Sequence, residues 1–155
     1  MSRALAERLG VPHVELDALF WRSGWQETPK EEFRERVVAT LADLDGWVVD
    51  GNYRSRLGTL VLEEAEMIVW LDLPLRTTLS RVLRRTLGRI RTRDPLWGSN
   101  TETWRNAFFR RDALWLFALK AHFRWRRRLP TLLAPFPHVR LRSKDDVERF
   151  LANVG

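Results

Sequence analysis

The alternation of short apolar runs with helical segments restricts the fold of this chain more than any other feature. Between the runs, apolar residues recur at helical spacing, and such a strand–helix alternation is typical of a parallel sheet flanked by helices. The third run is apolar without a break, as expected for a strand covered on both faces. We therefore expect an α/β fold in a single domain, residues 1–155, with four strands near His13–Leu16, Trp47–Asp50, Met67–Leu71 and His138–Leu141.

Capping and breaking residues predict where the helices begin and end. Thr28 as N-cap and Pro29 at the first helical position predict a helix that runs to about Asp43. Its apolar face carries Phe33, Val37 and Leu41. Three further helices are indicated: one ends at Gly10 after Leu5 and Leu9, one starts at Pro74 and ends near Gly88, and one starts at Ser143. A long helical stretch starts at Ser99 and is stopped by Pro130, Pro135 and Pro137.

Composition excludes several classes of protein. The chain has 155 residues, 45% of them hydrophobic, which is enough for one domain with a core. It has no cysteine, so disulfides, thiolate metal sites and cysteine nucleophiles are absent. The three histidines are too scattered to predict a zinc site. No run approaches the ~20 apolar residues of a membrane span, and no stretch resembles a signal peptide, so we expect a cytoplasmic protein.

Basic charge is concentrated in one part of the sequence. The net charge is +7, and only three of the 27 basic residues are lysines. From Arg76 to Arg128 there are 15 basic and 3 acidic residues. Base composition of the genome is an alternative source of the arginine bias, but it does not explain the uneven distribution. We expect an anionic partner to meet this segment.

Three aspartates follow predicted strands: Asp17, Asp50 and Asp72. Ligands of open parallel sheets bind beyond the carboxyl ends of the strands, so the three positions predict a polar site along one edge. The alternative for each residue is a loop cap or turn former, and this alternative carries most weight for Asp72.

Residues 48–54 give the most specific local signal. Two valines followed by Asp50 form a Walker-B-like element, in which the carboxylate holds magnesium directly or through water. Gly51 allows the backbone to pass close to a ligand, and Arg54 is placed to reach an anionic group. A plain Asp-Gly turn is the alternative, although it leaves Asn52, Tyr53 and Arg54 unexplained.

A series of arginines occupies a predicted helix end and the following loop. Positions 81, 84 and 85 share one helical face, and position 89 follows one turn later. Such a cluster can surround a triphosphate and neutralise charge during phosphoryl transfer. A solvated face or a nucleic-acid-binding face is the alternative.

Seven segments of the chain, named at the end of this paragraph, occur in an order and spacing that resemble the small P-loop kinases. The resemblance is specifically to the adenylate-kinase-related bacterial proteins often labelled DNA topology modulation proteins. The resemblance covers nearly the whole chain and implies a three-layer P-loop NTPase-type parallel sheet with a movable arginine-rich lid and helical insertion at about residues 76–128. The segments that carry it are Leu5–Trp21, Gly24-Trp25, Val49–Tyr53, Ile68–Pro74, Arg81–Arg93, Leu96–Asn100 and Arg140–Ser143.

The resemblance also implies roles for individual residues. Asp17 would orient or deprotonate an acceptor hydroxyl, and Asp50 would support Mg²⁺. Arg85 and Arg89 would clamp the phosphates of ATP during transfer. The acceptor would contact Asp17 and the loop residues Gly51, Asn52, Tyr53 and Arg54, and the donor nucleotide would contact Arg81, Arg91, Arg93 and Arg142. Asn52-Tyr53 stands where nucleotide kinases have Phe-Pro, which argues against a nucleotide acceptor.

One defining element of the family is absent from the 155 residues. No Gly-x-x-x-x-Gly-Lys-Ser/Thr loop is present, although its amides and lysine normally cradle the phosphates. The resemblance places this loop, and the strand before it, immediately ahead of Met1. We therefore expect an N-terminally truncated chain with a gapped or rearranged sheet, because the absent strand would lie between those that end at Asp50 and Asp72.

The sequence thus favours an ATP-dependent phosphotransferase, a kinase of nucleotides or small molecules, that is inactive or impaired in this truncated form. A basic nucleic-acid-binding protein is the alternative, suggested by the calculated isoelectric point of about 11.0. A peripheral membrane binder is ranked below both, and we expect no membrane partner. The sequence does not specify the acceptor, the donor preference or the oligomeric state.

Overall fold

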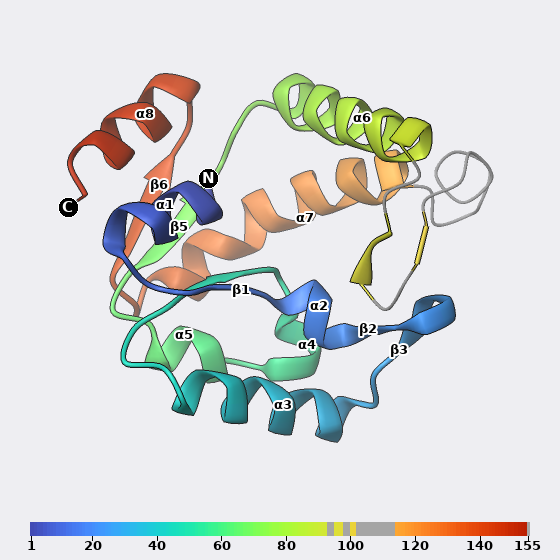
Figure 1. Cartoon of the computed structure of the whole chain (residues 1–155). Helices are drawn as coiled ribbons and strands as arrows, with labels where there is room; N and C mark the ends of the chain where they lie inside the picture. The colour runs from blue at the N-terminus through green and yellow to red at the C-terminus, as the bar shows by residue number, and fades with distance from the viewer. Residues whose placement is uncertain (93–94, 98–99, 102–113, 155) are drawn as a thin grey trace. The chain divides into compact units, whose positions relative to one another are not determined.

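The computed structural model describes residues 1–92, 95–97, 100–101 and 114–154 (Figure 1). The chain forms two compact units. The first unit comprises Met1–Glu64, Trp97–Asn100 and Asp145–Gly155, and the second comprises Ala65–Leu96 and Thr101–Lys144. Each unit contains its own pair of parallel strands together with helices. The fold is therefore mixed α/β, with short parallel sheets and flanking helices.

The first unit is built around strands β1 and β4, which pair in parallel with Val14 opposite Val49 and Glu15 opposite Asp50. Its elements are α1 (Ser2–Leu9), β1 (His13–Glu15), α2 (Leu16–Phe20), β2 (Trp21–Arg22), the 3₁₀ turn η1 (Ser23–Trp25), β3 (Gln26–Glu27), α3 (Lys30–Ala42), β4 (Val48–Asp50), α4 (Arg54–Leu57), α5 (Leu60–Glu64) and, from Asp145 on, α8 (Lys144–Ala152).

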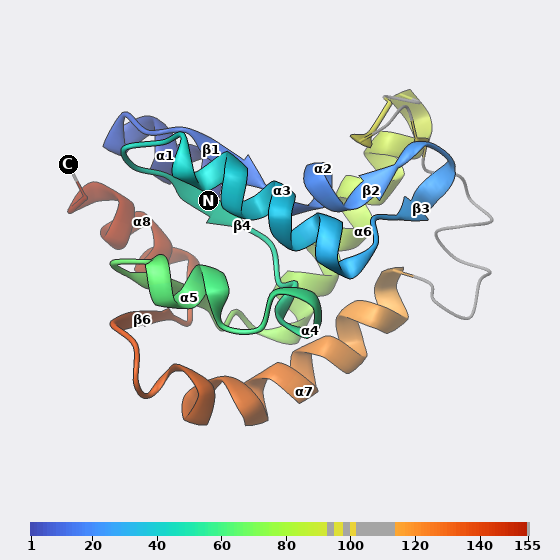
Figure 2. The ribbon, with the colours of Figure 1, turned by 90° about the horizontal axis from the view of Figure 1, so that it is seen from below.

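Two helices cover opposite faces of the β1–β4 pair (Figures 1 and 2). Val14 points to the side of α3, where Phe33 and Val37 are fully buried as the periodicity predicted. Because side chains alternate along a strand, His13 and Glu15 point to the other side, where α1 packs. The apolar core thus fixes which face of the strands presents polar groups.

The β2–β3 hairpin of the first unit is held by a side chain distant in sequence. Asn100 is buried, and its side chain accepts a hydrogen bond from the Trp25 amide (2.8 Å) and donates to the Arg22 carbonyl (2.9 Å). Trp25 lies at φ 58°, a backbone conformation that is unfavourable for a side chain of this size. Asn100 therefore stabilises a strained turn that local sequence does not favour.

Replacement of Asn100 by alanine is expected to destabilise the protein by about 2 kcal/mol, because two backbone groups lose a buried partner. Urea denaturation followed by circular dichroism measures this change, with Asn153→Ala, an exposed position, as the control. Equal midpoints for the two variants would show that Asn100 does not stabilise the turn.

The second unit contains β5 (Ile68–Leu71), α6 (Leu75–Thr92), α7 (Leu114–Leu133) and β6 (His138–Leu141). Strands β5 and β6 pair in parallel, with Ile68 opposite His138 and Leu71 opposite Leu141, and α6 packs against α7. Both strands lie where the apolar runs predicted strands.

Asp72, directly after β5, is the buried centre of an ion-pair cluster in the second unit. Its side chain is 1% exposed, and Arg140 donates two hydrogen bonds to Oδ2, at 3.0 and 2.5 Å. Arg126 of α7 lies 3.0 Å from Oδ1, and the Arg140 guanidinium stacks on the Trp70 ring at 4.1 Å. Asp72 therefore links β6 and α7 to the end of β5 through ion pairs, an arrangement that differs from the loop cap or turn former expected as the alternative.

The two parallel ladders, β1–β4 and β5–β6, are separate within the part of the chain that the structure describes. Strand β4 is paired only with β1 there, and β5 only with β6.

Several predicted helix boundaries are wrong. Helix α7 continues through Pro130 to Leu133, and α6 continues through Gly88 to Thr92. Leu133, which follows Pro130, and Ile90, which follows Gly88, are buried. Their burial offsets the cost in helix stability of about 3 kcal/mol for proline and about 1 kcal/mol for glycine. The predicted start at Ser99 lies outside the described residues.

Two other local predictions also fail. Thr28 does not cap α3; its hydroxyl is buried and donates to the Phe20 carbonyl at 2.8 Å, and Pro29 occupies the N-cap position. Gly10 ends α1 at φ 66° as predicted, but Leu9 is 47% exposed rather than packed with Leu5. Tertiary hydrogen bonding and packing override the local pattern in both cases.

Candidate functional site

Carboxylates gather at the carboxyl ends of β1 and β4 in the first unit. Glu15 and Asp50 are register partners at the last position of each strand, and Asp17 follows two residues later in α2. The sequence predicted Asp17 and Asp50 at this edge. Glu15 was missed because it lies inside the apolar run that predicted the strand.

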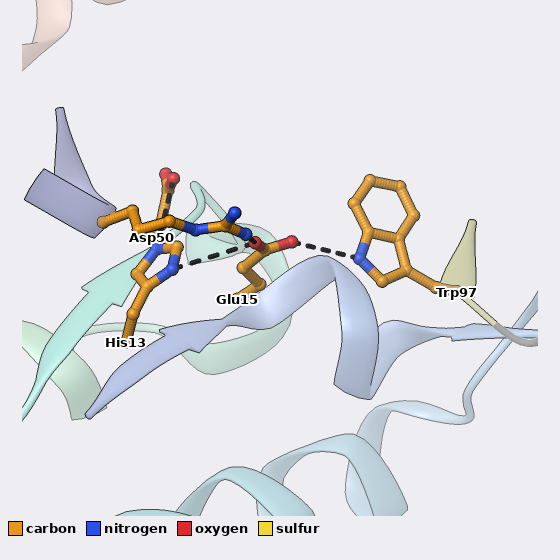
Figure 3. Close-up of polar contacts among 5 residues, drawn as sticks. His13, Glu15, Asp50 and Trp97 are labelled. Carbon is orange, nitrogen blue, oxygen red and sulfur yellow. Dashed lines mark hydrogen bonds and ion pairs between the residues drawn. The ribbon is translucent and has the colours of Figure 1, made fainter. Parts of the chain in front are cut away.

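His13 lies between two of these carboxylates (Figure 3). Its Nδ1 is 3.8 Å from Glu15 Oε1, and its Nε2 is 3.7 Å from Asp50 Oδ2. The imidazole is 14% exposed, whereas the Asp50 side chain is 57% exposed. The spacing of residues in the sequence does not predict a contact between His13 and Asp50. Asp50 is remote in sequence and comes close to His13 through the parallel pairing of β1 and β4. His13 Nε2 thus lies near the Asp50 carboxylate at a distance longer than a hydrogen bond, and that carboxylate stays open to solvent.

Glu15 is also contacted by Trp97 (Figure 3) and by Arg3. The Trp97 indole donates to Glu15 Oε2 at 3.2 Å, and Arg3 of α1 donates to Oε1 at 3.3 Å. Trp97 entered the sequence argument only through the family resemblance. A single carboxylate thus connects α1, β1 and the Trp97 segment of the first unit.

Asp17 and Tyr53 form the most direct contact among the predicted site residues. The Tyr53 hydroxyl donates a short hydrogen bond to Asp17 Oδ1. The Tyr53 ring packs against Phe20 and Phe33, with centroids 4.6 and 5.1 Å apart. Burial, followed by the hydrogen bond and charge of Asp17, raises the pKa of the Tyr53 phenol well above its ordinary value. The phenol therefore stays a protonated donor in the folded protein.

The loop between β4 and α4 contains the remaining predicted acceptor residues. Gly51 adopts φ 138°, and a Cβ there would lie 2.9 Å from the Cβ of Leu16. Only glycine fits this close approach of the two strand ends. Asn52 is exposed, and Arg54 is exposed at the start of α4.

The predicted donor-binding arginines lie in the second unit. Arg81 and Arg85, one turn apart on α6, line a cavity of about 240 Å³ together with Leu71, Leu73, Thr78 and Val82. Within the described residues neither arginine has an ionic or hydrogen-bonding partner. Arg89 and Arg91 lie nearer the end of the same helix, and Arg142 follows β6. Arg93 lies outside the described residues.

The two units differ in net charge. The first unit contains 9 basic and 15 acidic residues, and the second contains 18 basic and 5 acidic residues. The carboxylate cluster therefore belongs to an acidic unit and the α6 arginines to a strongly basic one.

The carboxylates of the site suit a magnesium ion that is held by one or two protein ligands, and not one enclosed by several. Among the described residues no group of three or more acidic or histidine side chains is placed to enclose a metal. Mg²⁺ commonly uses one or two carboxylates with the rest of its shell from water and substrate phosphates. The exposed carboxylate of Asp50 suits that mode.

Comparison with protein-family models, curated proteins and solved structures finds no match to this chain. In the described part of the chain, no helix has both the length and the apolar character needed to span a bilayer.

Proposed function

We propose that this chain is an ATP- and Mg²⁺-dependent phosphotransferase of the P-loop kinase type, which acts on a hydroxyl of a small molecule. The contact between Tyr53 and Asp17 carries this proposal. It joins α2 to the loop after β4, and these segments follow the paired strand ends at Glu15 and Asp50. These are the positions where the family resemblance places an acceptor-binding base and a metal-supporting aspartate.

In the proposed reaction Asp17 acts as the acceptor-side base. The acceptor oxygen forms a bond to the γ-phosphorus of ATP, the bond from that phosphorus to the β–γ bridging oxygen breaks, and ADP leaves. The hydroxyl proton passes to the Asp17 carboxylate. Asp50 would hold Mg²⁺, which when bound neutralises charge on the phosphates. Asn52 and Arg54, both exposed in the adjoining loop, would contact the rest of the acceptor.

The arginines of α6 would hold the donor phosphates. Arg81 and Arg85 have no ionic partner among the described residues, and the cavity that they line has apolar walls from Leu71 and Leu73. Arg89, Arg91, Arg93 and Arg142 would complete the donor contacts. Guanidinium groups suit this role because they bind phosphate oxygens in a bidentate manner.

The 155 residues contain no phosphate-cradling loop, so we propose that they bind the donor weakly by themselves. We expect a dissociation constant for MgATP above about 1 mM, which corresponds to about −4 kcal/mol. Isothermal titration calorimetry measures it, and the protein expressed with any in-frame codons upstream of Met1 is the comparison. A product that includes a Gly-Lys-Ser/Thr loop should bind at least tenfold more tightly. Equal affinities of the two proteins for MgATP would contradict the proposal that the absent loop causes the weak binding.

Nucleic-acid binding is a second candidate, favoured by one observation. Helix α6 carries six arginines and no acidic residue, and Arg81, Arg84 and Arg85 are exposed. If this face binds nucleic acid, affinity for duplex DNA should fall steeply with salt and be independent of ATP. A weak, ATP-competed interaction would instead favour donor-phosphate binding.

A further inference from the structure

We propose that Tyr53 is the positioning residue for Asp17: its hydroxyl fixes the orientation of the carboxylate that receives the acceptor proton. This inference deepens the proposed function, because it identifies what holds the base in place. It rests on the contact between the two side chains and on the aromatic packing that immobilises the phenol.

The packing makes Tyr53 a rigid support. Phe20 and Phe33 belong to the apolar core of the first unit, and both are almost fully buried. Two aromatic contacts fix the plane of the Tyr53 ring, so the hydroxyl has little freedom except rotation about its own C–O bond. Asp17 belongs to the five-residue helix α2. The Tyr53 hydroxyl gives its carboxylate a fixed hydrogen-bond donor, which helps the side chain to keep one orientation.

The protonation state of the pair is also fixed. Burial and the neighbouring Asp17 carboxylate both raise the pKa of the Tyr53 phenol, so the phenol donates at every pH at which a kinase works. Tyr53 therefore does not compete with Asp17 for the acceptor proton. The raised pKa also predicts loss of stability above about pH 10, where the unfolded chain begins to release the phenolic proton and the folded protein does not.

Tyr53 is the only tyrosine in the chain, which permits a direct spectroscopic test. In an alkaline titration, the phenolate absorption band is expected only well above pH 10, or only together with unfolding measured by circular dichroism. In Asp17→Asn the phenolate should form at a lower pH, because one of the causes of the raised pKa is removed. Phenolate formation in the folded parent at the ordinary pH of tyrosine, or an unchanged curve in Asp17→Asn, would overturn the pairing.

The kinetic arm uses Tyr53→Phe, which keeps the ring and removes only the hydroxyl. In a phosphoryl-transfer assay of the protein expressed with any in-frame codons upstream of Met1, we expect kcat to fall by about tenfold while the KM for ATP is unchanged. The effect should be absent in an Asp17→Asn background. Thr40→Val, which removes a hydroxyl bonded only to the Arg36 carbonyl, is the control. An unchanged kcat in Tyr53→Phe would refute the positioning role.

The two arms separate this inference from the proposed reaction. A chain that transfers no phosphoryl group, but shows the raised titration of Tyr53 and its change in Asp17→Asn, would refute the phosphotransferase and support the positioning of the carboxylate. Transfer that depends on Asp17 but not on the Tyr53 hydroxyl would do the reverse.

Discussion

Replacement of Asp17 by asparagine is expected to lower kcat for phosphoryl transfer by about 10²-fold or more, because the acceptor hydroxyl loses its proton acceptor. Asparagine keeps the size of the side chain and an oxygen that can accept the Tyr53 hydroxyl. The fold should therefore be preserved, and the KM for ATP should change little, since the donor is held by other residues. Steady-state transfer from γ-labelled ATP measures the effect.

The matched control for this substitution is Asp45→Asn, which removes one carboxylate from an exposed turn of the same unit. It should leave both kcat and KM unchanged. If Asp17→Asn retained more than about a third of the parental kcat, Asp17 would not be the base, since general-base catalysis typically contributes at least 10²-fold.

Loss of Asp72 is expected to be the most destabilising change of a charged residue. In Asp72→Ala the guanidiniums of Arg126 and Arg140 lose their common buried partner. Removing one member of a buried ion pair costs about 3–5 kcal/mol. We expect a value near the lower end, about 3 kcal/mol, because both arginines reach solvent. For a chain of this length that corresponds to a melting temperature lower by roughly 10 °C.

Differential scanning calorimetry measures the effect of Asp72→Ala, with Glu66→Ala as the control. Glu66 is an exposed acidic residue of the same unit, so its loss changes the net charge equally. A melting temperature for Asp72→Ala within about 2 °C of the control would show that the cluster does not stabilise the second unit.

The strands could be predicted because their signal is local. The runs before Asp50 and Asp72 are apolar and bounded by turn residues, and strands β4 and β5 lie there. Helix α3 was likewise predicted by its apolar face, with Phe33 and Val37 fully buried. Helix ends were predicted less well, because burial of Leu133 and Ile90 carries α7 and α6 past proline and glycine.

The polar geometry of the site was predicted only in part, for a physical reason. A strand end indicated Asp17 and a loop motif indicated Tyr53. Only the family resemblance grouped the two residues, which the structure places in hydrogen-bonding contact. The association of His13 with Glu15 and Asp50 depends on the register of two strands remote in sequence. Nothing in the spacing of residues 13, 15 and 50 specifies that register. The same applies to Asn100, whose partners lie in the β2–β3 hairpin.

Transfer of label from γ-labelled ATP to a small hydroxyl-bearing molecule tests the central claim most directly. The assay uses the protein expressed with any in-frame codons upstream of Met1, with and without Mg²⁺, and resolves the products from a mixture of small-molecule acceptors. Our account predicts a labelled product that requires Mg²⁺ and is lost in both Asp17→Asn and Asp50→Asn. Absence of any labelled product, or label that persists undiminished in both variants, would contradict it.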